Sequence, residues 1–436
     1  MEHKRSVRYI ALEILDQVLT EGGYSNLLIN EAIKEGYVEP VDRALLTELV
    51  YGTLQHKLTL EFYIEPFIKA NIKGWMRRLL LMSVYQAVYL DKVPDHAIIN
   101  EAVEITKQRG SISGANTMNA ILRNFQRSEL RDFAEIKDDL KRLSIETSTP
   151  LWLIKHWNTH FGYDKTRAMA EEFLTYPDTT VRVNTTKITI EEAIQRLQDE
   201  GYTVEQSEII PECLAIDGPP IVQNPLFKHG FLSVQDASSM LVANVLDPQE
   251  GETILDACSA PGGKSCHIAE KMNRTGRVVS HDIYPHKIDL IKYNINRLSL
   301  RNIEPSVHDA LEPFEGIYDR VLVDAPCSGF GVIKRKPEIK YEKTPKDIDT
   351  LWPMQLEILT NASKVVKPGG LLVYSTCTIE QMENDNVVYS FIKQNPDFEI
   401  EPIKLPVLGE HKLLQILPQD LKSDGFFIAK LRRKSE

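Results

Sequence analysis

Residues 253–264 read TILDACSAPGGK, and the architecture of the second half of the chain follows from this stretch. An apolar, β-prone run ends at Ala257, a turn with Pro261 and two glycines follows, and a helical pattern begins at Lys264. A strand, a glycine-rich turn and a helix in this order are typical of a doubly wound sheet, in which ligands bind at the carboxyl ends of the strands. The glycines let a ligand approach the backbone, and the helix N-terminus favours negative charge.

Downstream of this stretch, strand-like and helical patterns alternate to the end of the chain. We expect strands at 253–257, 277–280, 305–308, 320–323, 371–374 and 425–431. We expect helices at 264–271, 285–298, 346–366 and 380–394. This alternation predicts an α/β, Rossmann-like domain over residues 231–436.

Upstream, the pattern differs. Residues 1–145 show apolar positions at helical spacing, punctuated by Pro40, Pro66 and Pro94, and predict an all-α bundle. Residues 146–230 mix helical patterns with short β-prone runs and predict a small α+β module between the two larger domains.

Composition describes an ordinary globular chain. It has 436 residues, of which 42% are hydrophobic and 26% charged, with a net charge of −11 and five cysteines. Scattered cysteines in so long a chain fit a reducing compartment rather than a disulfide framework. The N-terminus resembles no secretory signal, and the charge-free stretch Leu79–Leu90 is shorter than the ~20 residues that span a bilayer. We therefore expect a soluble cytoplasmic protein that has no membrane partner.

The glycine-rich turn is neither GxGxxG nor a phosphate-binding GxxxxGK[ST] loop. Asp282 follows Gly263 at about the 20-residue distance at which an acid binds the hydroxyls of a ribose. Asp309, after the third strand, is a candidate for the adenine end. A single acid here is most simply a solvated loop carboxylate, but two acids at successive strand ends favour a nucleoside ligand. S-adenosylmethionine, which has a ribose, an adenine and a sulfonium but no phosphate, suits this loop better than a dinucleotide.

Two cysteines follow apolar strands of the same domain. Asp324-Ala325-Pro326-Cys327 comes after one strand, and Ser375-Thr376-Cys377 comes after another, so both thiols should lie at the ligand-binding edge of the sheet. Thr378 and Gln381 match a capping box, which predicts that Cys377 lies just before a helix N-terminus, where the pKa of a thiol falls.

Two simpler interpretations of the cysteines stand beside this one. Free cysteines are often small core residues, and we expect this of Cys213 and Cys266. A zinc site is the second alternative, but the chain has no CxxC pair and its cysteine spacings are irregular. We expect no metal.

A basic segment follows Cys327. Between Gly331 and Lys346 six basic residues stand against Glu338 and Glu342, with Tyr341 and Trp352 as stacking surfaces. Such charge runs are usually solvated faces. Because this one adjoins the predicted ligand edge, we interpret it as a track for a phosphate backbone.

Five stretches together resemble the Nop2/Sun family of RNA 5-methylcytosine methyltransferases: DACSAPGGKS (256–265), HDIYPHKI (281–288), VLVDAPCSGFGVIKRKPEIKY (321–341), YSTCTIEQMEN (374–384) and DGFFIAKL (424–431). The resemblance covers residues 231–436. Ser259 stands where the family often has Ala, and Leu421-Lys422 precede Ser423 where a His-Gly is more usual. Residues 1–145 resemble a NusB-type RNA-binding bundle. Together the two resemblances imply a methyltransferase that acts on 16S ribosomal RNA of the small ribosomal subunit.

The resemblance also implies roles for individual residues. Cys377 is implied as the nucleophile that attacks cytosine C6, Cys327 as the helper in release, and Asp324 and Lys264 as further catalytic residues. The residues implied to line the S-adenosylmethionine pocket are Cys258, Ser259, Ala260, Pro261, Gly262, Gly263, Lys264, Asp282, Asp309 and Asp324.

Three alternatives stay open at this point. One is an enzyme that methylates cytosine in DNA, although the two cysteines and the NusB-like bundle favour RNA. The chain could be a non-catalytic RNA-binding or assembly factor that keeps a methyltransferase-like fold, although a binder has no need of Cys377. It could also methylate a protein or a small molecule, although an amine or oxygen acceptor needs no thiol. With no coiled-coil repeat in the sequence, we expect a monomer.

Overall fold

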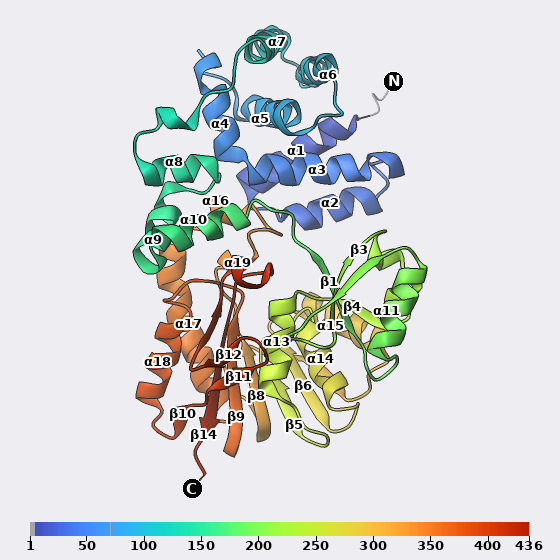
Figure 1. Cartoon of the computed structure of the whole chain (residues 1–436), viewed down its shortest axis with the longest axis vertical. Coiled ribbons are helices and arrows are strands. Elements are labelled where there is room, and N and C mark those ends of the chain that lie inside the picture. Colours follow the sequence, from blue (N-terminus) through green and yellow to red (C-terminus); the bar gives the residue numbers. More distant parts are fainter. Residues whose placement is uncertain (1–4, 70, 436) are drawn as a thin grey trace. The chain divides into compact units, whose positions relative to one another are not determined.

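The computed structural model describes residues 5–69 and 71–435, which form two compact units (Figure 1). The first, here called the helical unit, comprises the chain up to Thr175 together with Ile333–Lys343. The second, here called the sheet unit, comprises Tyr176–Val332 and the chain from Thr344 onward. A short piece of the C-terminal half of the sequence is therefore folded into the N-terminal unit.

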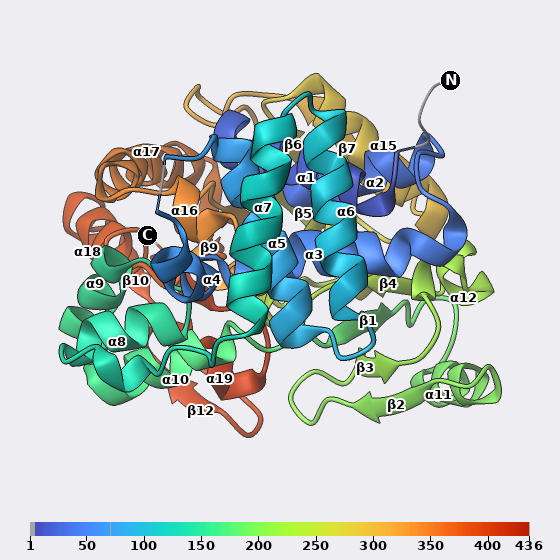
Figure 2. The ribbon, with the colours of Figure 1, turned by 90° about the horizontal axis from the view of Figure 1, so that it is seen from above.

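The helical unit confirms the predicted all-α bundle. Its helices are α1 (Val7–Glu21), α2 (Ser25–Lys34), α3 (Arg43–Gln55), α4 (Lys57–Ile64), α5 (Gly74–Tyr89), α6 (Asp95–Gln108), α7 (Ile112–Gln126), α8 (Asp139–Glu146), α9 (Leu151–Phe161), α10 (Tyr163–Glu172) and, from the inserted piece, α16 (Ile339–Glu342). Helix α1 begins where the Ser6 side chain accepts a hydrogen bond from the Tyr9 N–H. Helix α5 is buried over most of its length, and α6 and α7 lie side by side (Figure 2).

The sheet unit begins with a small α+β module. Strands β1 (Thr179–Val183), β2 (Thr203–Gln206), β3 (Cys213–Asp217) and β4 (Leu232–Val234) form an antiparallel sheet in the order β2-β3-β1-β4. Helix α11 (Ile190–Asp199) packs its apolar stripe on this sheet, and α12 (Pro225–Lys228) precedes β4. The module has the α+β character that the sequence predicts, but α9 and α10, which fall within the predicted range 146–230, belong to the helical unit.

The large sheet has the order β10-β14-β9-β8-β5-β6-β7, with β13 paired to β14. Strands β5 (Thr253–Asp256), β6 (Arg277–Asp282), β7 (Ile303–Val307), β8 (Tyr318–Asp324) and β9 (Val366–Thr376) are parallel. Strand β14 (Phe426–Arg433) runs antiparallel to β9, and β10 (Phe398–Ile400) and β13 (Leu414–Ile416) run antiparallel to β14. A separate hairpin joins β11 (Ile403–Leu405) to β12 (Gly409–His411).

Helices cover both faces of the large sheet, as a mostly parallel sheet requires. Helices α13 (Ala237–Leu246), α14 (Gly263–Lys271) and α15 (Pro285–Leu298) bury one face, and α17 (Pro345–Ser363) and α18 (Asp385–Gln394) bury the other (Figure 1). Helix α19 (Pro418–Leu421) is a single turn before β14. The strand order reverses at β5, which lies between β6 and β8, so the ligand site is expected at the carboxyl end of β5.

The structure corrects one local prediction. Helix α18 begins at Asp385, not at residue 380; residues 378–380 are irregular and residues 381–384 form a turn. Cys377 therefore lies eight residues before the helix, and the predicted effect of a helix N-terminus on its pKa is wrong. In addition, no helix among the described residues is long and apolar enough to cross a lipid bilayer.

Candidate active site

The turn after β5 is fixed to the end of β6. The Ser259 N–H and hydroxyl donate to the carbonyl oxygen of His281 at 2.8 and 2.9 Å, and the Ala260 N–H donates to Asp282 Oδ2 at 3.3 Å. Gly262 has φ +96°, and a Cβ there would lie 3.1 Å from the Ile291 side chain. Glycine is therefore required for the turn to lie this close to α15.

Beyond the turn, the first residues of α14 are open to a ligand. A Cβ added to Gly263 would meet no described atom within 4 Å, and no described side chain caps the helix. Behind it, buried Asp256 accepts a hydrogen bond from Ser265 Oγ at 2.6 Å through Oδ2, while its Oδ1 has no partner among the described residues. Burial raises the pKa of Asp256 to about 7.

The two predicted nucleoside-binding acids are placed differently. Asp282 ends β6, is 8% exposed, and accepts from the N–H groups of Ala260 and Tyr284. Asp309 lies just past β7, where its Oδ1 accepts from the Leu311 N–H at 3.0 Å. The His308 N–H donates to the Asp282 carbonyl oxygen at 3.1 Å, so the two acids lie on adjoining strand ends.

An ion pair lies on the other side of the turn. Lys264 Nζ, from α14, is 2.8 Å from Asp324 Oδ2, at the end of β8, and Ser375 Oγ, in β9, donates to Asp324 Oδ1 at 2.7 Å. Burial disfavours the ammonium form, but the nearby Asp324 carboxylate outweighs it, and the pKa of Lys264 is raised. Both Asp324 oxygens accept hydrogen bonds, one from Lys264 and one from Ser375, which fixes the orientation of the side chain.

Next to this pair, the sulfur atoms of Cys327 and Cys377 lie 3.3 Å apart. The pKa of Cys377 is lowered, first because it accepts a hydrogen bond from the Cys327 thiol and then because of the Lys264 ammonium, although burial opposes both. The pKa of Cys327 is raised by that same hydrogen bond, by burial and by the charges of Glu383 and Asp324. These opposite pKa shifts favour a thiolate on Cys377 and a thiol on Cys327.

A close backbone contact holds the two cysteine segments to β14. The Gly331 N–H donates to the Cys377 carbonyl oxygen at 3.0 Å, and the Gly425 N–H donates to the Gly331 carbonyl oxygen at 2.9 Å. A Cβ on Gly331 would lie 1.8 Å from the Gly425 oxygen. Only glycine fits at residue 331.

Most of the predicted site residues thus gather around one turn. Hydrogen bonds join the 258–264 turn to Asp282, Lys264 to Asp324, and Cys327 to Cys377. Ser375 was not among the predicted site residues, although it lies inside the stretch YSTCTIEQMEN. Arg182 of β1 was not among them either; it forms a buried ion pair with Glu270 and donates to the Gly263 carbonyl oxygen at 3.1 Å. No local pattern marks Arg182.

The proposed phosphate track between Gly331 and Lys346 is wrong for its central residues. Lys334 is 7% exposed and paired with Glu172, and Lys340 is fully buried, donating to the Gln55 carbonyl oxygen at 3.0 Å. The Tyr341 hydroxyl donates to the Leu54 carbonyl oxygen at 2.9 Å. These side chains anchor residues 333–343 in the helical unit, and they are not available to an RNA backbone.

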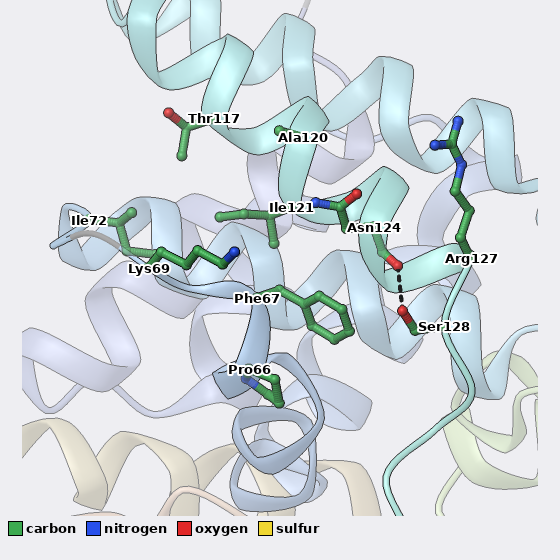
Figure 3. Close-up of a pocket in the computed structure, with 10 residues that line it drawn as sticks. All are labelled: Pro66, Phe67, Lys69, Ile72, Thr117, Ala120, Ile121, Asn124, Arg127 and Ser128. Atoms are coloured by element: carbon green, nitrogen blue, oxygen red, sulfur yellow. Dashed lines mark hydrogen bonds between the residues drawn. The ribbon is translucent and has the colours of Figure 1, made fainter.

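The helical unit has a separate surface pocket of about 580 Å³ between its α4–α5 connection and α7 (Figure 3). Phe67 lies in its middle, with Lys69 and Arg127 towards opposite ends and Asn124 near the ring. Lys69, Asn124 and Arg127 are exposed. The pocket combines an aromatic ring, an amide and two cations.

Among residues 5–69 and 71–435, no three His, Cys, Asp or Glu side chains gather in a way that could hold a metal ion. The titratable groups at the carboxyl end of the large sheet instead form the ion pair and the thiol pair described above. The chemistry that these groups can perform is nucleophilic attack by a thiolate beside a fixed ammonium and carboxylate.

Three known families match consecutive parts of the chain. Residues 243–432 match the family described as 16S rRNA methyltransferase RsmB/F, residues 5–127 match the NusB family, and residues 149–223 match the ferredoxin-like domain of RsmF/B-like methyltransferases.

Relatives match over the whole chain. The probable ribosomal RNA small subunit methyltransferase B of Bacillus subtilis is 45% identical, with 99% of each chain covered. That of Synechocystis is 33% identical, with 98% of this chain and 99% of the relative covered. Among solved structures, PH0851 has a TM-score of 0.83 at 27% identity, with 99% of each chain covered. The chain therefore belongs to the RsmB/F family of 16S rRNA methyltransferases and carries that family's NusB and ferredoxin-like domains.

Proposed function

We propose that this protein transfers a methyl group from S-adenosylmethionine to C5 of a cytosine in 16S ribosomal RNA, through a covalent bond between Cys377 and C6. The observation that carries the proposal is the 3.3 Å contact between Cys327 and Cys377 beside the Lys264–Asp324 ion pair. A methyltransferase that acts on an amine or an oxygen has no use for two thiols at this place.

The chemistry follows from the weak nucleophilicity of cytosine C5. When the Cys377 thiolate adds to C6, the C5–C6 double-bond electrons move to C5, which becomes a nucleophilic, enamine-like carbon. S-adenosylmethionine, when bound, supplies a sulfonium methyl group that leaves with its carbon–sulfur electrons on sulfur. The C5 proton must then be removed. The electrons of that C–H bond re-form the double bond and expel the Cys377 thiolate.

Cys327 is suited to remove that proton. In the free enzyme its thiol donates to the Cys377 thiolate, and this hydrogen bond is the largest cause of its raised pKa. Once the Cys377 sulfur is bonded to C6, it no longer accepts this hydrogen bond as a thiolate, and the pKa of Cys327 falls. Cys327 can then lose its proton to water, and the resulting thiolate can accept the proton from C5. The elimination restores the Cys377 thiolate.

Lys264 and Asp324 orient the base. The Asp324 side chain accepts a hydrogen bond from the cytosine 4-amino group, and the Lys264 ammonium donates to the ring as negative charge builds up on N3 during thiolate addition. Ser375 fixes the carboxylate for this task.

The donor set around the turn fits S-adenosylmethionine. The open start of α14 and the unpartnered, buried Oδ1 of Asp256 are suited to its amino-acid part. Asp282 would bind the ribose hydroxyls and Asp309 the adenine end. The turn residues Cys258, Ser259, Ala260, Pro261, Gly262 and Gly263 would line the pocket, with Lys264 and Asp324 at the methyl end.

The substrate is expected to be a base in a loop or one extruded from its stack, because a base inside a duplex cannot reach a site at a sheet edge. The NusB and ferredoxin-like domains would hold flanking RNA, and we expect the protein to act as a monomer.

The test is methyl transfer from labelled S-adenosylmethionine to 16S rRNA, both naked and in assembling small subunits. We expect label in 5-methylcytosine, none with Cys377→Ala, and a covalent protein–RNA adduct that accumulates with Cys327→Ala. Cys213→Ala, which removes a thiol buried in the small module, is the matched control and should retain activity. RNA binding without transfer would favour the assembly-factor alternative, and full activity of Cys377→Ala would overturn the choice of nucleophile.

A further inference from the structure

Two adjacent buried residues, Glu383 and Asn384, contact the segments of both reactive cysteines, yet neither takes part in the proposed reaction. Both are fully buried and lie in the turns between β9 and α18. Burying a carboxylate without a cation beside it is costly, so its contacts should matter for more than packing.

Glu383 holds the Cys327 segment. Its Oε2 accepts hydrogen bonds from the Ser328 N–H at 2.8 Å and from Gln355 Nε2 at 2.9 Å. Gln355, from α17, also donates to the Pro326 carbonyl oxygen at 2.8 Å. The carboxylate and the amide therefore fix the residues on both sides of Cys327.

Asn384 holds the Cys377 segment in the same way. Its Oδ1 accepts from Thr376 Oγ1 at 2.6 Å, and its Nδ2 donates to the Thr378 carbonyl oxygen at 3.0 Å. The same Nδ2 donates to Gln415 Oε1 at 2.9 Å, which ties the turn to β13. The residues on both sides of Cys377 are thus fixed by one side chain.

The two segments are also joined directly, because the hydroxyls of Ser328 and Thr378 lie 2.8 Å apart. Each of these residues follows one of the cysteines. The distance between the two sulfur atoms therefore depends on a network that Glu383 and Asn384 complete.

We propose that Glu383 and Asn384 are positioning residues with separate tasks: Asn384 aims the Cys377 sulfur for attack on C6, and Glu383 aims the Cys327 sulfur for release. The proposal rests on the proposed function, since it assigns the two cysteines to two steps. A misplacement of about 1 Å at a reacting atom can slow a step about 100-fold, so the loss of either network should be visible in one step and not in the other.

Single-turnover kinetics with 16S rRNA separates the steps, because quenched samples show both the covalent adduct and the methylated product. At a pH high enough to ionise Cys377 without the Cys327 hydrogen bond, Glu383→Ala should form the adduct at close to the wild-type rate. It should resolve the adduct at least about tenfold more slowly, so that the adduct accumulates. Asn384→Ala should form the adduct at least about tenfold more slowly without accumulating it.

Conservative variants guard against simple misfolding. Glu383→Gln keeps an oxygen acceptor for the Ser328 N–H and should recover most of the release rate, whereas Gln355→Met removes only the amide contacts and should slow release moderately. Glu357→Gln, on the exposed side of the same helix α17, is the control and should behave as wild type. Thermal unfolding and S-adenosylmethionine binding report whether each variant is folded.

The outcomes are distinguishable. If Glu383→Ala and Asn384→Ala slow both steps equally, or only in proportion to the loss of folded protein, the positioning roles are wrong. If Cys327→Ala fails to trap an adduct, the proposed function fails whatever the Glu383 and Asn384 variants do.

Discussion

The sulfur atoms of Cys327 and Cys377 lie 3.3 Å apart although the residues are 50 positions apart in sequence. Their strands β8 and β9 are parallel neighbours, so both cysteines leave the sheet at the same edge. A disulfide has a sulfur–sulfur distance of about 2.05 Å. An oxidant can therefore join the two cysteines of the proposed active site in a disulfide.

We therefore expect reversible oxidative inactivation. Hydrogen peroxide should oxidise the Cys377 thiolate to a sulfenic acid, which condenses with the Cys327 thiol to a disulfide and water. Mass spectrometry should find the 327–377 crosslink, and dithiothreitol should restore activity. In Cys327→Ala, peroxide should instead leave a sulfenic acid on Cys377. Recovery of a crosslink to Cys258 would show that the thiols are arranged differently.

The pH dependence of adduct formation should report the hydrogen bond between the thiols. This bond lowers the pKa of Cys377, so the thiolate persists at lower pH than an ordinary thiol allows. Cys327→Ala removes the donor, which should raise the pKa of Cys377 and move the rising limb of the pH–rate profile for adduct formation to higher pH. Rapid-quench measurements across the neutral and alkaline range test this prediction. A rising limb at the same pH in Cys327→Ala as in the wild type would contradict it.

The Lys264–Asp324 ion pair should matter for chemistry more than for binding. Lys264→Met removes the ammonium from the site, so we expect the rate of adduct formation to fall by about 100-fold. It should also raise the pKa of Cys377, since the Lys264 charge is among the causes that lower it. Lys287→Met, which removes a half-buried lysine 3.8 Å from Asp282, is a control for charge near the cofactor side. If Lys264→Met changed only the affinity for RNA, the proposed role would be wrong.

Sequence patterns located the elements of the large sheet because parallel strands buried on both faces are apolar runs. Helix α15 was predicted with its observed bounds, Pro285–Leu298, where Pro285 marks the first turn. Helix α13 was missed, since its apolar residues, buried nearly all round, show no helical period. The start of α18 was misplaced because Thr378 and Gln381 match a capping box in sequence. In the structure, the Asn384 side chain instead forms hydrogen bonds to Thr376 and Thr378, on the two sides of Cys377.

Only the site residues that local sequence patterns mark could be predicted. The turn and the two cysteines follow strands, so topology brings them to one edge. Ser375, Arg182 and Glu383 act through contacts with residues far away in sequence, which no local pattern encodes. The basic segment was misinterpreted for the same reason, since Lys340 is buried by helices from the other end of the chain.

The burial of Lys340 should make the free energy of unfolding depend on pH. Burial lowers its pKa from 10.5 to about 7 in the folded protein. Between these values the unfolded chain binds more protons than the folded one, so the free energy of unfolding should rise with pH from about 7 to 10. This contribution should disappear in Lys340→Met, whose pH slope should be smaller by about 1 kcal/mol per pH unit. Chemical denaturation at several pH values measures it. Equal slopes would mean that Lys340 titrates normally.

The pocket around Phe67 should bind single-stranded RNA that flanks the target. Lys69 and Arg127 are exposed cations on either side of an aromatic ring, a combination that suits a phosphate backbone and a stacked base. In Lys69→Gln/Arg127→Gln, affinity for an rRNA fragment should fall, and the slope of log K against log salt should shrink by about 0.7 for each phosphate that is no longer neutralised. Phe67→Leu should weaken binding without changing that slope, because stacking releases no counterions.

A matched double variant separates a local effect from a change in net charge. Lys137→Gln/Lys141→Gln removes two cations from another part of the helical unit, near α8, and should leave the affinity and the salt slope close to wild type. If both double variants weakened binding equally, RNA would be responding to the overall charge of the unit, and the Phe67 pocket would have no specific role. If neither did, the RNA would bind elsewhere, and the aromatic ring would serve only its edge-on packing against Phe125.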